Sequence, residues 1–448
     1  MASHESDIEQ KIDALLAAAT GVSIDSRTAN PGDLFFAIHG EQFDGNRFAQ
    51  KALDAGCIGA VVSQRELAGT DERFIWVPDG LQALQEAAQR KRNTWHLPVL
   101  ALTGSNGKTT TKELIRDVLA TTKSTAATIG NFNNEIGVPL TILRMPDDLE
   151  VAVLEMGANA QGEIRRLVEI AEPTHALITN IGLAHLEGFG GPEGVKKGKS
   201  EIFGAMRAKQ SGHAFARAAD PVLMEVTEGL ERTAYGTEAC PPMVRAAKAG
   251  HGAFEWWDGQ VWHGPVPTAL EGMHNLQNIA TALAVGLHFG VDPADASAAI
   301  AAYRPENNRS EWRNTGKNRV LLDAYNANPS SMNATLQYFA EALAAQATPP
   351  NALMVLGEMG ELGAYSRDGH ADVARLAGEI AVDLPGSVIL VGPSYADAIG
   401  ELLLPENVFC CAKVADVERM LRAHPPLGQT ILLKGSRSVA LETLLPLL

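Results

Sequence analysis

The strongest constraint in this 448-residue sequence is a glycine loop between an apolar run and a helix-forming segment. The apolar run 98–102 predicts a buried strand, and residues 110–115 predict the first turns of a helix. Between them stands Thr-Gly-Ser-Asn-Gly-Lys-Thr-Thr, residues 103–110. Backbone N–H groups of such a loop, together with the helix N-terminus, bind phosphate oxygens. The spacing therefore predicts a nucleoside triphosphate site, although Leu102 stands where the usual pattern has its first glycine.

Two side chains of this loop suit phosphate chemistry. Lys108 can reach a terminal phosphate, and the hydroxyl group of Thr109 can bind Mg²⁺. The alternative is a polar turn before an ordinary helix. The agreement of strand, loop and helix in one segment favours the phosphate site.

Composition limits the class of protein. At roughly 150 residues per domain, the length predicts three domains. The formal net charge of −16 disfavours a nucleic-acid partner or an anionic membrane surface, both of which need basic patches. No apolar run reaches the roughly 20 residues of a membrane span, so we expect no stable membrane insertion. The four cysteines form no CxxC pair and the N-terminus lacks a signal-peptide core, which indicates reduced thiols in a cytoplasmic protein.

Alternating strand and helix patterns predict the fold class. We expect an α/β protein with a smaller N-terminal unit, a central mainly parallel sheet carrying the phosphate loop, and a C-terminal Rossmann-like unit. The predicted domains are residues 1–95, 96–305 and 306–448. Within the central domain, residues 195–208 predict helical structure, and residues 250–267 predict a β-hairpin or a small antiparallel region.

Polar residues follow two predicted strands of the central sheet, where ligands bind in such folds. Glu155 ends the predicted strand 151–155 and is a candidate Mg²⁺ ligand; a helix-capping carboxylate is the alternative. His185 follows the strand 176–180, and a structural histidine is the alternative to a metal ligand. Lys199 lies in a basic segment in which composition alone favours a solvated face for Lys196 and Lys197.

Motifs along the whole chain resemble those of the Mur ligase family, the ATP-dependent amide ligases of peptidoglycan precursor synthesis. The resemblance rests on residues 103–110, 130–139, 155–157, 180–185 and 433–437. It implies a three-domain fold, ATP and Mg²⁺ as cofactors, and a cytoplasmic enzyme that we expect to be a monomer.

Three further segments favour one branch of this family. Residues 323–329, residues 356–363, and residues 25–27 with 43–46 resemble the branch that joins D-alanyl-D-alanine to UDP-N-acetylmuramoyl-tripeptide. The tripeptide-forming branch and a folylpolyglutamate synthase-like enzyme are the alternatives; the latter places its phosphate loop near the N-terminus, whereas about a hundred residues precede Lys108 here. A nucleotide-dependent switch without ligase activity would leave the motifs of the third domain unexplained. The third residue of the accepted peptide, diaminopimelate or lysine, stays open.

The resemblance also implies roles for individual residues. Expected at ATP are Gly104, Ser105, Asn106, Gly107, Lys108, Thr109, Thr110, Asn134, Asn275, Asn278, Arg309 and Asp323. Expected at Mg²⁺ are Thr109, Glu155, His185 and Lys199, the last as a carbamate formed with CO₂. Expected to act in catalysis are Lys108, Lys199, His185 and Arg309. Expected at the UDP substrate are Ser26, Arg27 and Asn46, and at the dipeptide Asn326, Asn328 and Lys434. Residues 216–220 depart from the Asn-x-Asp-Asp run that the family often carries, so no role is carried over to them.

Overall fold

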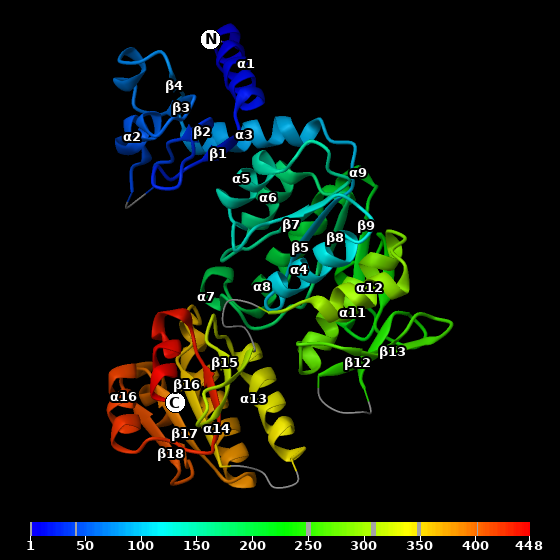
Figure 1. The fold of residues 1–448 in the computed structure, drawn as a ribbon, viewed down its shortest axis with the longest axis vertical. Coiled ribbons are helices and arrows are strands. Elements are labelled where there is room, and N and C mark those ends of the chain that lie inside the picture. Colours follow the sequence, from blue (N-terminus) through cyan, green and yellow to red (C-terminus); the bar gives the residue numbers. More distant parts are fainter. Residues whose placement is uncertain (1, 41–42, 248–251, 306–310, 347–350, 401) are drawn as a thin grey trace.

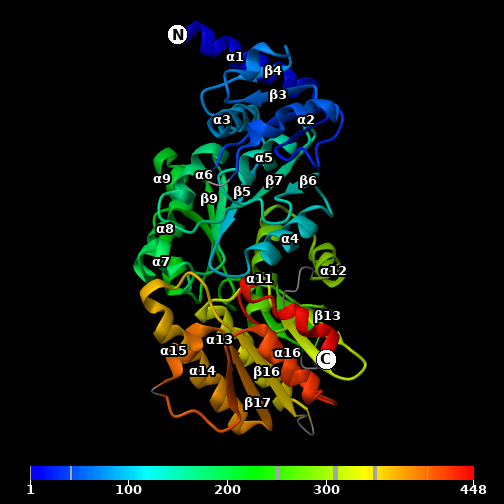
Figure 2. The same cartoon turned by 90° about the vertical axis from the view of Figure 1, so that its left-hand side faces the viewer.

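The computed structural model shows three α/β units that follow one another along the long axis of the molecule (Figure 1). It describes residues 2–40, 43–247, 252–305, 311–346, 351–400 and 402–448. The view turned by 90° shows the same succession, with the N-terminus at one end and the C-terminal unit at the other (Figure 2). The predicted three-unit α/β fold is confirmed.

The N-terminal unit holds a four-stranded parallel sheet in the order β1-β2-β3-β4. Its strands are β1 (Gly21–Ser23), β2 (Asp33–Phe36), β3 (Gly59–Val62) and β4 (Phe74–Trp76). Its helices are α1 (Ala2–Ala18), α2 (Ala49–Asp54) and α3 (Gly80–Asn93), with short 3-10 turns η1 (Gly45–Phe48) and η2 (Leu67–Gly69). The Asp79 side chain starts α3, because it accepts hydrogen bonds from the free N–H groups of Leu81 and Gln82.

The central unit holds six parallel strands in the order β10-β9-β8-β5-β7-β6. They are β5 (Val99–Thr103), β6 (Thr125–Ala127), β7 (Val151–Glu155), β8 (His175–Ile178), β9 (His213–Arg217) and β10 (Glu231–Tyr235). Helices cover both faces: α4 (Lys108–Leu119), α5 (Gly137–Arg144), α6 (Glu163–Ala171), α7 (Leu186–Phe189), α8 (Pro192–Ser200), α9 (Gly204–Lys209), α10 (Pro221–Val226), α11 (Met273–His288) and α12 (Pro293–Ala302). Because β5 and β7 are buried on both faces, their sequences are continuous apolar runs.

The helical structure predicted over residues 195–208 is confirmed. The structure breaks it into α8 and α9, separated by the 3-10 turn η3 (Glu201–Phe203). The break turns the Glu201 carboxylate toward the start of α6, where it accepts hydrogen bonds from the N–H groups of Gly162 and Arg165. A carboxylate at a helix N-terminus satisfies free donors and the helix dipole, a tertiary contact that local periodicity does not encode.

A small antiparallel sheet extends the central unit. It consists of β11 (Met243–Ala246), β12 (Ala253–Trp257) and β13 (Trp262–Pro267), so the hairpin predicted within residues 250–267 is confirmed, although residues 250–251 lie outside the described residues. The indole of Trp256 is fully buried and donates to Ser297 of α12.

The C-terminal unit holds six strands in the order β14-β15-β19-β16-β17-β18, parallel except for β14. They are β14 (Glu311–Asn314), β15 (Arg319–Asp323), β16 (Ala352–Gly357), β17 (Gly386–Val391), β18 (Val408–Cys411) and β19 (Thr430–Lys434). The helices are α13 (Pro329–Ala344), α14 (Ser366–Asp383), α15 (Pro393–Ile399) and α16 (Val414–Ala423), with the 3-10 segments η4 (Gly363–Tyr365), η5 (Arg437–Val439) and η6 (Leu441–Leu447).

The cysteines and the apolar helices also bear on the class of protein. Cys57, Cys240, Cys410 and Cys411 are free thiols. Over the described ranges, we find no helix whose length and apolar character would let it cross a bilayer.

Three histidines meet at the edge of the central sheet where its strands begin. His175 and His213 are paired neighbours on β8 and β9, and His288 at the end of α11 places its Nε2 atom 3.3 Å from Nε2 of His175. Burial, and then repulsion from His288 and His213, lower the pKa of His175 to about 4. Beside the cluster, Glu231 Oε1 lies 3.5 Å from Nδ1 of His213.

We predict that acid destabilises this edge of the sheet. A histidine whose pKa falls on folding binds its proton more readily in the unfolded chain, so stability is lost as the pH falls from about 6.5 toward 4, by about 3 kcal/mol. In His175→Phe, the decrease of the urea unfolding midpoint between pH 7 and pH 4.5 should become smaller. His96→Phe, at an exposed histidine of the same unit, is the control. Equal pH dependence in both variants would contradict the prediction.

Candidate active site at the junction of the central and C-terminal units

The phosphate loop lies between β5 and α4 and depends on two glycines. Gly104 and Gly107 have φ angles of +153° and +76°. A Cβ atom at Gly104 would lie 1.9 Å from Oγ1 of Thr179, and one at Gly107 would lie 2.6 Å from Oδ1 of Asn278. Conformation and space therefore both exclude larger residues. Lys108 folds back over the loop, where its Nζ donates to the carbonyl of Gly104 at 2.8 Å.

The carboxylate of Glu155 lies at the end of β7, beside the start of α4. Its side chain is 1% exposed, and Oε1 accepts hydrogen bonds from Asn133 at 2.8 Å and from Thr109 at 3.4 Å. Oε2 is buried and accepts no hydrogen bond from the described residues; Nζ of Lys112 lies 3.8 Å away. A buried carboxylate oxygen without a hydrogen bond suits a cation. Sequence reasoning gave Asn133 no role, although it lies in the motif 130–139.

The donor set near Glu155 fits Mg²⁺ rather than a cage of protein ligands. Among the described residues, no group of three or more His, Cys, Asp or Glu side chains is placed to hold a metal. Mg²⁺ typically keeps several waters and binds one or two carboxylates together with substrate phosphates. Glu155 and Thr109 beside a phosphate loop provide this arrangement.

The structure buries Lys199 on α8. The residue is 1% exposed, and its Nζ lies 5.3 Å from the ring centre of Phe189. Burial, and then the charge of Lys108, hold the pKa of Lys199 well below its ordinary value. Lys199 does not line the main cavity described below, whereas Glu155 and His185 do.

Residues of two units enclose one cavity of about 730 Å³. From the central unit come the phosphate loop, Glu155, His185, Asn275 and Asn278. From the C-terminal unit come Asp323, Tyr325, Asn326, Ser330 and Lys434. The amide of Asn328 donates to Oδ1 of Asn106 at 2.8 Å, which joins the loop directly to the C-terminal unit. Most of the predicted ATP, metal and dipeptide residues therefore lie around one space.

Asn275 and Asn278 stand on the first turns of α11, next to the loop. Nδ2 of Asn278 donates to Oδ1 of Asn275 at 3.2 Å, and Oδ1 of Asn278 accepts from Thr111 at 3.1 Å. These bonds fix Asn278 against Gly107. Asn134 also lines the cavity, where its Oδ1 accepts from the N–H groups of Ile136 and Gly137 at the start of α5.

A buried ion pair joins the ends of β15 and β19. Nζ of Lys434 lies 2.6 Å from Oδ2 of Asp323, which also accepts from Thr335 at 2.9 Å. Burial raises the pKa of Asp323, but the charge and hydrogen bond of Lys434, together with Thr335 and His274, outweigh this effect and hold that pKa below its ordinary value. Arg309, predicted to lie near these residues, is outside the described residues.

The predicted UDP residues lie in the N-terminal unit and do not line the main cavity. Arg27 is an exposed side chain held by Asp25 at 2.6 Å. Asn46 is buried, and its Oδ1 accepts from the N–H groups of Ser63 and Gln64. Ser26 is buried in the loop after β1. These contacts do not test whether the three residues bind the UDP substrate, so that role stays a prediction.

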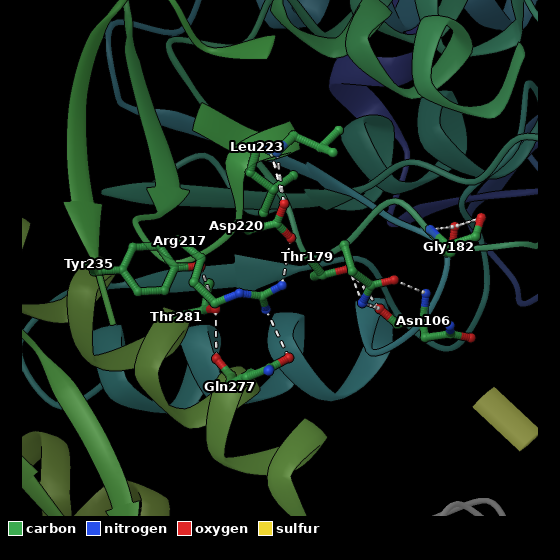
Figure 3. Close-up of polar contacts among 12 residues, drawn as sticks. Asn106, Thr179, Gly182, Arg217, Asp220, Leu223, Tyr235, Gln277 and Thr281 are labelled. Atoms are coloured by element: carbon green, nitrogen blue, oxygen red, sulfur yellow. Dashed lines mark hydrogen bonds and ion pairs between the residues drawn. The ribbon is translucent and has the colours of Figure 1, made fainter. Parts of the chain in front are cut away.

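A polar cluster at the end of β9 had no sequence-based role. Figure 3 shows Arg217 between Asp220 and Gln277, to each of which it donates at 2.8 Å. All three line the main cavity, and they also line a smaller neighbouring cavity of about 320 Å³ whose wall includes Met273 and Leu276. In the sequence, the one signal for this cluster is that Arg217 and Asp220 lie at and just after the end of a parallel strand, where ligands bind in such folds.

The fold and this site define a protein that binds a nucleotide in a phosphate loop at the carboxyl edge of a parallel sheet. Three family descriptions match the chain: "Mur ligase family, catalytic domain" at residues 18–92, "Mur ligase middle domain" at 102–286, and "Mur ligase, glutamate ligase domain" at 308–437.

Curated relatives match over nearly their full length. The UDP-N-acetylmuramoyl-tripeptide–D-alanyl-D-alanine ligase of Bacillus subtilis is 33% identical, over 94% of this chain and 91% of its own. The ligase of the same name from Escherichia coli is 34% identical, over 94% and 92%.

Solved structures agree with these relatives. MurF from Acinetobacter baumannii has a TM-score of 0.82 at 30% identity and covers 98% of this chain and 97% of its own. The MurF ligase of Thermotoga maritima, solved in complex with ADP, has a TM-score of 0.80 at 28% identity and covers 97% of both chains. The chain belongs to the Mur ligase family.

We predict that the Asp323–Lys434 pair is needed for stability of the C-terminal unit. Lys434→Met leaves a buried carboxylate without its cation, which should cost about 3–5 kcal/mol. The double variant Asp323→Asn, Lys434→Met removes both charges, and the amide oxygen that replaces the carboxylate can still accept from Thr335, so much of the loss should be recovered. Urea unfolding followed by circular dichroism measures both. A double variant as unstable as Lys434→Met would contradict this account.

Proposed function

We propose that this protein uses ATP to join the amino group of D-alanyl-D-alanine to the terminal carboxylate of UDP-N-acetylmuramoyl-tripeptide. The observation that carries the proposal is the shared cavity, in which Lys108 of the phosphate loop and Asn326 and Lys434 of the C-terminal unit face one space. The names of the curated relatives support the same reaction. We place it in the cytoplasm, where peptidoglycan precursors are made.

The reaction has two chemical steps. The terminal carboxylate of the tripeptide attacks the γ-phosphorus of ATP, so that an acyl phosphate forms and ADP leaves. The amine of D-alanyl-D-alanine then attacks the acyl carbon, and the tetrahedral intermediate expels phosphate while the nitrogen loses a proton. Lys108 and the N–H groups at the start of α4 stabilise the transferring phosphoryl charge, and the two units hold the reactants in line.

Residues at the end of β7 and at the start of α4 would hold Mg²⁺. Glu155 and Thr109 would bind it together with phosphate oxygens, and His185 lies across the same cavity. The cation would supply charge stabilisation for the phosphoryl group.

Lys199 suits a carbamate for a physical reason. CO₂ reacts with a neutral amine, and burial lowers the pKa of Lys199 toward the neutral form. Carbamate formation would convert a buried base next to Lys108 into a carboxylate that attracts cations.

We assign the remaining roles by position. Asn275 and Asn278 would lie near adenine. Arg217, Asp220 and Gln277 line the same main cavity. Asp323 and Arg309 would approach ribose and phosphates. The dipeptide and the acyl phosphate would lie near Asn326, Asn328 and Lys434, and the uridine nucleotide near Ser26, Arg27 and Asn46. The functional units would be residues 1–95, 96–305 and 306–448.

We predict that ADP release depends on both substrates. With ATP, Mg²⁺ and UDP-N-acetylmuramoyl-tripeptide, turnover should require D-alanyl-D-alanine and should not respond to single amino acids. A coupled ADP assay, with mass spectrometry of the UDP product, measures this. Turnover only with a single amino acid, or with a folate acceptor, would refute the assignment. Parallel assays with UDP-linked tripeptides that end in diaminopimelate or in lysine identify the accepted third residue.

We predict that Lys199→Ala lowers turnover by about 100-fold or more, because the site loses a group that orients the charged reactants. Formate or acetate should restore part of the activity if the lost group is a carboxylate. Removal of CO₂ should slow the unmodified protein in the same way. Lys197→Ala, at an exposed lysine of the same helix, is the control. Full activity of Lys199→Ala would remove Lys199 from the site.

A further inference from the structure

Glu361 belongs to the motif 356–363, but no role follows for it from the site described above. It lies between β16 and η4 of the C-terminal unit, with a φ angle of +62°. Its partner His185, at the start of α7 in the central unit, has a φ angle of +53°. Residues other than glycine rarely adopt this left-handed backbone, and such strain often marks functional positions.

The two strained residues meet at the seam between the units. Nδ1 of His185 lies 2.5 Å from Oε2 of Glu361, and the N–H of Glu187 donates to the carbonyl of Glu361 at 3.2 Å. In Figure 1, α7 lies at the side of the central unit that faces the C-terminal unit. The seam is tight, because a Cβ atom at Gly363 would lie 3.0 Å from Cβ of Glu187.

The contact determines which ring nitrogen of His185 can bind a ligand. Nδ1 of His185 is buried and makes no well-aligned hydrogen bond with the described residues, but a carboxylate oxygen 2.5 Å away favours a proton on Nδ1, because a lone pair there would face a negative charge. An imidazole whose single proton lies on Nδ1 has its lone pair on Nε2. His185 lines the cavity together with Glu155 and Lys108. Histidines that bind metals typically donate their other ring N–H to a carboxylate in this manner.

Stability alone gives little reason for this pair. The Glu361 side chain is 57% exposed and that of His185 is 19% exposed. Ion pairs with so exposed a partner contribute little to folding. Both residues keep a strained backbone although the ion pair contributes little to stability. We therefore infer that the pair serves to orient the imidazole ring of His185.

We propose that Glu361 is a positioning residue, which holds His185 with Nε2 available for the cation and phosphate chemistry of the cavity. Because Glu361 comes from the C-terminal unit, docking of that unit completes the donor set of the central unit. The catalytic consequence of this inference rests on the proposed function. The state of the His185 ring does not depend on that function.

The test compares Glu361→Ala, Glu361→Gln and the control Asp368→Ala, an exposed carboxylate in the first turn of α14. Long-range ¹H–¹⁵N spectra of histidine-labelled protein without nucleotide report the ring state, with the His185 signals assigned from a His185→Gln sample. The unmodified protein and Asp368→Ala should show the Nδ1–H form. Glu361→Ala should show both tautomers, whereas Glu361→Gln should keep the Nδ1–H form because its amide oxygen can accept.

Kinetics give the second readout. In Glu361→Ala, the Mg²⁺ concentration for half-maximal turnover should rise at least fivefold and kcat should fall about 10-fold, while KM for the dipeptide changes less than twofold. The Mg²⁺ dependence and kcat of Glu361→Gln should lie between those of the unmodified protein and those of Glu361→Ala. A Glu361→Ala protein with an unchanged ring state and unchanged Mg²⁺ dependence would overturn the inference. If the unmodified protein turns over none of the substrates, the proposed function fails, and the spectra still decide the role of Glu361.

Discussion

The site depends on the backbone conformation of the phosphate loop, which its neighbours hold in place. Thr179 at the end of β8 donates to the carbonyl of Asn106 at 2.7 Å, and the side chain of Asn180 accepts from the Asn106 N–H at 3.1 Å. Oγ of Ser105 bonds both the N–H and the carbonyl of Gly182. The loop is therefore braced by the next strand of the sheet before any phosphate binds, and little ordering remains to oppose binding.

Docking of the C-terminal unit extends the same bracing across the cavity. Asn328 starts α13 by accepting from the N–H of Ser331, and its amide nitrogen reaches Asn106. Also in the first turn of α13, Oγ of Ser330 accepts a hydrogen bond from the N–H of Leu183. Residues at the start of this helix thus contact the central unit, Asn328 at the phosphate loop and Ser330 at the segment after β8. A site built from two units excludes water and places two substrates together only when the units are in contact, which is what a reaction through a hydrolysable acyl phosphate requires.

Sequence could predict what is encoded locally. The strand 151–155 matches β7 residue for residue, because a buried parallel strand is a continuous apolar run with a polar residue at its end. The loop at 103–110 was recognisable because its glycines and Gly-Lys-Thr act within one segment. The contacts of Arg217 and Glu361 were not predictable in the same way, since each depends on a partner far away in the chain, Gln277 and His185 respectively. The break at Glu201 has the same cause, because its carboxylate serves the start of another helix.

Three equally buried lysines differ in the charged groups around them, and this difference separates their roles. Lys112, Lys199 and Lys434 are each 1% exposed. Lys434 has Asp323 at 2.6 Å, and Lys112 has Glu113 and Glu155 at 3.7 and 3.8 Å, so carboxylates balance both ammonium groups. For Lys199, the described residues provide an aromatic ring and a second lysine nearby, but no carboxylate within ion-pair distance. A cation is costly to bury there, and a neutral amine is less so. The same environment lowers the pKa of Lys199 and so favours the neutral amine, whose nitrogen is nucleophilic, and the proposed reaction with CO₂ requires such a nitrogen.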